Sequence, residues 1–231
     1  MSIFSELRKR FRPNGFQLPQ EPFGVGDTER CIEIPWAFSC YRGEKRVLDV
    51  GYANAEDRYL DGLLSLGIPE LYGLDRITKD TEGIISVEGD IRKTDFLDEF
   101  FDLVFCISTI EHVGRDNSIY FQAGDLMDYL GDFRAIKEIA RITREKGRIV
   151  LTVPYGKFCD YGWFIQYDKK RIDEMILESN CRILQQDFFI YRRGWFTCKR
   201  DALKNNLYRD DGAPAASGLI CILLEKAELL A

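Results

Sequence analysis

Histidine is almost absent from the sequence, because His112 is the only one among 231 residues. A zinc site would therefore need cysteines or carboxylates, and neither occurs at spacings typical of zinc ligands. The seven cysteines include no C-x-x-C pair, and their odd number argues against a disulfide framework. We predict reduced thiols and no metal.

Long apolar runs and net positive charge are also missing. A run such as 219–224 is far shorter than the roughly 20 residues of a membrane-spanning helix, and the N-terminus has no continuous apolar stretch of the signal-peptide type. We therefore expect a cytoplasmic protein without a transmembrane segment. The formal charge of −6 disfavours general binding to nucleic acid, which needs an extended basic surface.

What is present is an alternation of short apolar runs with segments of helical periodicity. This order predicts a Rossmann-like, doubly wound α/β fold with seven strands, mostly parallel with an antiparallel last strand and with helices on both faces. The predicted strands are 46–50, 70–75, 83–88, 101–107, 147–153, 181–191 and 218–225, and the predicted helices are 55–66, 126–143 and 168–178. We expect one domain over 1–231, with 1–41 as an N-terminal cap and 114–125 as a lid.

The stretch RVLDVGYANAED, residues 46–57, begins like a dinucleotide-binding strand and turn but lacks G-x-G-x-x-G. Only Gly51 remains, since Ala53 and Glu56 occupy the other two glycine positions. Glu56 and Asp57 place carboxylates in the first turn of the following helix, where they would repel a pyrophosphate. A ligand with a cationic sulfonium and no phosphate, such as S-adenosylmethionine, meets no such repulsion. The alternative is an ordinary strand end and turn.

Carboxylates also follow the second and third predicted strands. Asp75 ends the second strand, where an acidic side chain can accept both hydroxyls of an adenosine ribose. Asp90 follows the third strand, where it can accept the adenine amino group while Ile91 packs on the ring. Each alone is equally well explained as a solvated turn residue. Together they predict a nucleoside site at the carboxyl ends of the strands.

These segments resemble the class I S-adenosylmethionine-dependent methyltransferases. The motifs that carry the resemblance are VLDVGYANAE, LYGLD, EGDIRKTDF, FDLVFCISTIEHVG and EIARITREKGRIVLTVPYGK, within residues 46–157. The resemblance implies an enzyme in which Asp49 and Gly51 hold the methionine part of the cofactor and Ser108 lies near the sulfonium. Ala53 departs from the family glycine and puts the cofactor affinity in question. The residues expected to bind the cofactor are Asp49, Gly51, Tyr52, Asp75, Arg76, Asp90, Ile91 and Ser108.

His112 is the candidate catalytic residue. A hydroxyl acceptor must lose a proton as it is methylated, and His112 follows the fourth strand at the edge of the expected pocket. It would act as the general base. The alternative is that it only supports the loop.

Segments outside the shared motifs should bind the methyl acceptor. We expect Tyr120 in the lid, Tyr155 after the fifth strand, and Arg192, Arg193 and Trp195 after the sixth, because arginine binds phosphate and tryptophan packs on sugar rings. The motifs IEHVG and VPYGK with Tyr167-Asp168 resemble those of glycan- and sugar-modifying methyltransferases. This resemblance implies O-methylation of a small hydroxylated acceptor such as a nucleotide-linked sugar or glycan precursor. The alternative places the aromatics in the core and pairs the arginines with Asp187, Asp210 or Asp211.

Residues 2–12 combine Phe4, Leu7 and Phe11 on one helical face with a basic cluster opposite. They can pack on the domain as a cap or make a peripheral membrane contact. Two other functions stay open: a non-catalytic interaction module with the same fold, and an NAD-dependent sugar oxidoreductase or epimerase. The second lacks Tyr-x-x-x-Lys after the fourth strand. The sequence leaves the oligomeric state undecided.

Overall fold

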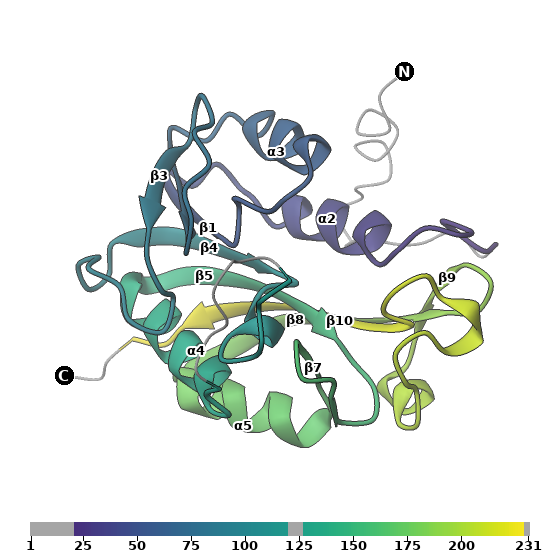
Figure 1. Cartoon of the computed structure of the whole chain (residues 1–231). Helices are drawn as coiled ribbons and strands as arrows, with labels where there is room; N and C mark the ends of the chain where they lie inside the picture. Colours follow the sequence, from purple (N-terminus) through teal and green to yellow (C-terminus); the bar gives the residue numbers. More distant parts are fainter. Residues whose placement is uncertain (1–20, 120–126, 229–231) are drawn as a thin grey trace.

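The computed structural model describes residues 21–119 and 127–228, and it builds them around one large sheet (Figure 1). The strands of this sheet are β1 (Arg46–Val50), β2 (Glu70–Asp75), β3 (Ile85–Glu88), β4 (Phe101–Ile107), β5 (Thr143–Pro154), β8 (Cys181–Tyr191), β9 (Trp195–Cys198) and β10 (Gly218–Lys226). The helices are α2 (Arg30–Ser39), α3 (Asp57–Leu64), α4 (Gly131–Ile142) and α5 (Lys169–Ser179), with short 3-10 turns η1 (Ile110–His112), η2 (Arg200–Leu203) and η3 (Asp210–Gly212).

The strand order is β3-β2-β1-β4-β5-β10-β8-β9. Strands β1 to β5 pair in parallel, whereas β10 runs antiparallel to both β5 and β8. The predicted doubly wound α/β fold with an antiparallel last strand is therefore confirmed. The sheet has eight strands where seven were predicted, because the chain turns back after β8 and adds β9 at the edge.

Helices cover both faces of the sheet (Figure 1). On one face, α2 and α3 bury an apolar cluster that includes Trp36 and Leu63 against β1 and β4. On the other, Ile136 and Ile139 of α4 and Ile172 of α5 pack on a second cluster. The central strands are buried on both sides, which explains their nearly continuous apolar sequence.

Besides β9 and the short 3-10 turns, the sequence-based prediction lacks a helix and a hairpin. The N-terminal segment contains the helix α2, and a small hairpin of β6 (Cys159–Asp160) and β7 (Ile165–Gln166) follows β5. Residues 2–12 and the second half of the predicted lid, 120–125, lie outside the described residues. Within the described part of the chain, no helix is long and apolar enough to cross a membrane.

Candidate active site

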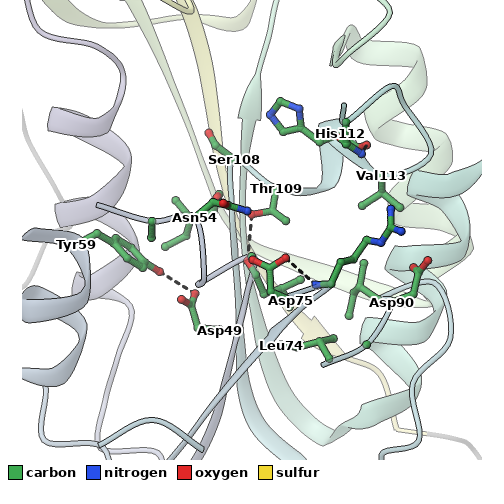
Figure 2. A pocket seen from close by; sticks show the side chains of 18 of the residues that line it. Asp49, Asn54, Tyr59, Leu74, Asp75, Asp90, Ser108, Thr109, His112 and Val113 are labelled. Carbon is green, nitrogen blue, oxygen red and sulfur yellow. Dashed lines mark hydrogen bonds between the residues drawn. The ribbon is translucent and has the colours of Figure 1, made fainter. Parts of the chain in front are cut away.

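A cavity of about 300 Å³ lies at the carboxyl ends of β1, β2 and β4 (Figure 2). Open α/β sheets bind their ligands at this edge. Seven of the eight predicted cofactor residues, and the predicted base, line it: Asp49, Gly51, Asp75, Arg76, Asp90, Ile91, Ser108 and His112. The eighth, Tyr52, is fully buried beside the cavity, where its hydroxyl donates to the carbonyl of Lys79 at 3.1 Å.

The turn after β1 requires glycine at position 51. Gly51 has a φ of +89°, and an added Cβ would lie 2.6 Å from Oγ1 and 2.8 Å from Cγ2 of Thr109. The turn then brings the N–H of Ala53 to Oδ2 of Asp75 at 3.0 Å, so the backbone at position 53 helps to position the predicted ribose carboxylate. Ala53 itself is buried in this turn.

Only one of the two carboxylate oxygens of Asp49 has a hydrogen-bond partner among the described residues. Tyr59 of α3 donates its hydroxyl to Oδ1 at 2.7 Å (Figure 2). Among the described residues, Oδ2 has no hydrogen-bond partner although it is buried. Burial raises the pKa of Asp49 to about 7. A buried, unpartnered carboxylate oxygen on a cavity wall suits a cationic ligand group.

Asp75 holds the turn and still has room for a ligand. Its Oδ1 accepts from the N–H of Arg76 at 2.7 Å, and its Oδ2 accepts from Ala53. Each carboxylate oxygen can accept a second hydrogen bond, so both can still bind ribose hydroxyls. Burial raises the pKa of Asp75 from its ordinary value.

Asp90 is more occupied than its sequence position suggested. The guanidinium group of Arg92 donates two hydrogen bonds to the Asp90 carboxylate, from Nε to Oδ1 at 3.0 Å and from a terminal nitrogen to Oδ2 at 2.5 Å. The backbone N–H of Arg92 adds a third bond to Oδ1, and its guanidinium also reaches Asp128 at 3.3 Å. An adenine amino group would therefore have to share Asp90 with Arg92.

His112 lies on η1 and faces the cavity from the side opposite Asp75 (Figure 2). Its Nδ1 lies 2.9 Å from the carbonyl oxygen of Trp163. Because a carbonyl only accepts, Nδ1 carries the hydrogen, and Nε2 is an acceptor when the ring is neutral. Burial lowers the pKa of His112 to about 4, which keeps the ring neutral at physiological pH.

Asn117 is a second acceptor beside His112. Its Nδ2 donates to the carbonyl of His112 at 2.9 Å, which fixes the orientation of the amide. The side chain is buried and lines the cavity, and its Oδ1 has no hydrogen-bond partner among the described residues. Such an oxygen favours a ligand that donates a hydrogen bond.

Ser108 connects the cavity to the N-terminal segment. Its φ of +42° is unusual for a residue with a side chain. Its hydroxyl donates to Oε2 of Glu33 at 2.7 Å, and Thr152 of β5 donates to the same oxygen at 2.7 Å. The fully buried Glu33 thereby joins α2 to the carboxyl ends of β4 and β5.

The predicted acceptor-binding residues are not gathered at this cavity. Tyr155 and Trp195 are buried in the core, where their rings pack on Phe188 and Tyr191, respectively. Both are therefore core residues, contrary to the prediction that they bind the acceptor. Arg192 and Arg193 are exposed in the turn between β8 and β9, beyond the cavity lining. Tyr120 lies outside the described residues.

The cavity also contains residues that the sequence did not single out. Their elements are α2, the turn before α3, α3 itself, and the segments after β3 and η1. They include Arg30, Asn54, Tyr59, Arg92 and Asn117. Among residues 21–119 and 127–228, no three histidine, cysteine or carboxylate side chains gather as metal ligands.

Residues 69–151 match a family model described as a methyltransferase domain. No curated protein matches the sequence. Among solved structures, a SAM-dependent methyltransferase from Methanosarcina mazei is similar at 14% identity, with a TM-score of 0.55 over 82% of this chain and 95% of that one.

A second similar structure is the 1,6-didemethyltoxoflavin-N1-methyltransferase of Burkholderia thailandensis with bound S-adenosylhomocysteine, at 12% identity and a TM-score of 0.56 over 85% of this chain and 79% of that one. The [4+2]-cyclase SpnF shares the fold at 13% identity and a TM-score of 0.51, over 80% of this chain and 75% of that one. The family match covers residues 69–151, and most of the chain shares the fold of these solved structures.

Proposed function

We propose that this chain is an S-adenosylmethionine-dependent methyltransferase that methylates a hydroxyl of a small acceptor, such as a nucleotide-linked sugar or a glycan precursor. The observation that carries the acceptor chemistry is the pair of hydrogen-bond acceptors on one wall of the cavity. His112 offers Nε2 and Asn117 offers Oδ1. A molecule with neighbouring hydroxyl groups supplies a donor to each.

The cavity fits the cofactor on its own geometry. The turn at Gly51 packs so closely on Thr109 at the cavity wall that a Cβ has no room, and the unpartnered Oδ2 of Asp49 suits the methionine ammonium. Asp75 suits the ribose hydroxyls, and Ile91 the adenine ring. When bound, S-adenosylmethionine supplies a sulfonium methyl group that is already activated for displacement by a nucleophile.

The protein then has to hold the acceptor in line and remove one proton. The acceptor oxygen would take the methyl group of the bound cofactor, which leaves as S-adenosylhomocysteine when the sulfur–methyl bond breaks. Nε2 of His112 would accept the proton of the acceptor hydroxyl, while the carbonyl of Trp163 holds the hydrogen on Nδ1. Asn117 fixes a neighbouring donor of the acceptor and thereby its orientation. His112 and Asn117 thus have separate tasks, proton removal and alignment.

A methyl-transfer assay against nucleotide sugars and small polyols tests this proposal. The proposal requires release of S-adenosylhomocysteine that depends on the acceptor, together with calorimetric binding of S-adenosylmethionine. Binding without transfer to any acceptor would favour the non-catalytic module. Tight NAD binding would favour the oxidoreductase, but Glu56 borders the cavity at the N-terminus of α3, where it opposes a pyrophosphate.

We expect the turnover number at saturating cofactor to be flat between pH 6 and 8. Because burial lowers the pKa of His112 to about 4, the base is already neutral throughout this range, and its activity is lost only as the pH falls towards that value. A kcat profile over this range checks the prediction. An inflection near pH 6.5 would mean that the titrating base is another group or lies in a more exposed setting.

We expect Asp75→Ala to weaken S-adenosylhomocysteine binding by about 10-fold or more, because charged hydrogen bonds contribute about 1.5–3 kcal/mol each. Calorimetry measures the loss. Asp57→Ala is the matched control, since this neighbouring carboxylate is 91% exposed and pairs with Lys79. Equal weakening by both variants would indicate a general electrostatic effect and would remove Asp75 from the ribose site.

A further inference from the structure

The strongest feature that the proposed mechanism does not use is the phenol of Tyr59. It approaches Asp49 from the first turn of α3, and its ring is held by Phe38 at a centroid distance of 5.5 Å. The side chain is 7% exposed, and both Tyr59 and Asp49 line the cavity. The hydroxyl therefore has a fixed direction towards Oδ1 of Asp49.

We infer that Tyr59 is a positioning residue for the amino-acid end of the cofactor. By donating to Oδ1, it orients the Asp49 carboxylate so that the unpartnered Oδ2 receives the methionine ammonium. This inference rests on the proposed function and adds a residue to the cofactor site that lies outside the matched domain. It also predicts that binding of the amino-acid end is linked to a proton.

The proton linkage follows from the surroundings of Asp49. Tyr59 of α3 and Arg30 of α2 favour its charged form, whereas burial and the nearby carboxylate of Asp75 oppose it. Because burial dominates and raises the pKa to about 7, a protonated Asp49 must lose its proton before it can pair with an ammonium. Affinity for a ligand with the ammonium is therefore present above pH 7 and is lost as the pH falls below it.

Two ligands separate this effect from titrations at the nucleoside end of the site. S-adenosylhomocysteine carries the ammonium, whereas 5′-methylthioadenosine keeps the adenine, ribose and thioether but has no amino-acid part. Asp75 and Asp90 face both ligands alike. We expect the affinity for S-adenosylhomocysteine to fall roughly 5- to 10-fold from pH 7.5 to pH 6, and that for methylthioadenosine to change less than about 2-fold.

Tyr59→Phe tests the positioning role directly. Loss of the donated hydrogen bond raises the pKa of Asp49 further, so S-adenosylhomocysteine binding at pH 7 should weaken about 10-fold and the midpoint of its pH dependence should rise. Methylthioadenosine binding should be unchanged. Tyr167→Phe is the control, because its hydroxyl also donates to a buried carboxylate, Asp132 at 3.1 Å, away from the cavity.

Calorimetry at four pH values between 6 and 7.5 gives the result. The inference is overturned if both ligands show the same pH dependence, or if Tyr59→Phe weakens both equally, which is what a purely structural role predicts. Either outcome leaves the methyltransferase proposal intact. Absence of S-adenosylhomocysteine binding at every pH would overturn the proposed function and this inference together.

Discussion

His112→Ala should lower the methyl-transfer rate by about 10²–10⁴-fold while leaving S-adenosylhomocysteine binding nearly unchanged. The variant removes the ring nitrogen that we propose as the base, whereas Asp49 and Asp75, which we propose as cofactor ligands, lie on the strands β1 and β2. Single-turnover kinetics with a saturating acceptor measures the loss. It should be in kcat, because a general base acts only as the acceptor reacts.

His112→Asn separates catalysis from support of the loop. An asparagine amide can replace Nδ1 as the donor to the Trp163 carbonyl, but it has no basic nitrogen at the position of Nε2. If His112 is catalytic, the His112→Asn variant should be as inactive as the His112→Ala variant. Phe164→Leu changes packing near the same ring, at a centroid distance of 6.1 Å, and should stay active. Activity retained by the Asn variant would assign His112 to structure alone.

Gly51→Ala should weaken cofactor binding by about 100-fold or more. The new Cβ would meet Thr109 at 2.6 Å, and the positive φ adds backbone strain of about 1–3 kcal/mol. Thr109 is held in place because its single hydroxyl hydrogen is shared between the carbonyl oxygens of Val50 and Ile107, each 3.0 Å from Oγ1. The turn has to shift, and the hydrogen bond from the N–H of Ala53 to Oδ2 of Asp75 is then lost. Calorimetry with S-adenosylhomocysteine measures the loss.

Gly67→Ala is the matched control for backbone strain. Gly67 also has a positive φ, +67°, but no atom lies within 4 Å of an added Cβ. It should lower the melting temperature without changing cofactor affinity. Thr109→Ala combined with Gly51→Ala should recover part of the lost binding, because it removes the two closest atoms. If Gly51→Ala bound the cofactor normally, the turn after β1 would have no part in the site.

The gathering in one cavity of the residues that we propose as cofactor-binding could be predicted, because it follows from the strand pattern. In a parallel sheet the carboxyl ends of neighbouring strands meet at one edge, so the residues after β1, β2, β3 and β4 converge without any knowledge of helix packing. Asp49, Asp75 and Ser108 line the cavity as a result. The fork of Arg92 on Asp90 was not predictable, since it depends on side-chain direction.

The acceptor half could not be predicted because composition alone does not place side chains. The stretch around Arg192 combines positive charge with aromatics, but the chain reverses there to form β9. Trp195 then turns inward against Tyr191, and the two arginines project outward. The residue that does face His112, Asn117, belongs to an unremarkable polar loop, and only its buried and unpartnered oxygen distinguishes it.

Helix α2 escaped prediction for a different reason. Pro35 lies inside it, and an internal proline lacks a backbone donor and normally ends or bends a helix. Tertiary packing overrides that preference, since Trp36 and Ile32 are fully buried against the sheet. The helix then places Arg30 at the cavity, far in sequence from any motif that indicated the site.

The bonds of Glu33 to Ser108 and Thr152 determine how a substrate can enter. If α2 lifted away, two hydroxyls and a buried carboxylate would lose their partners. Ile32 and Trp36 would also be exposed to water, at a cost of about 1.5–3 kcal/mol for a side chain of this size. The helix is therefore a fixed wall of the cavity. In the proposed reaction, the acceptor has to enter along another route. The turnover number should therefore not change when a crosslink fixes α2 to the sheet.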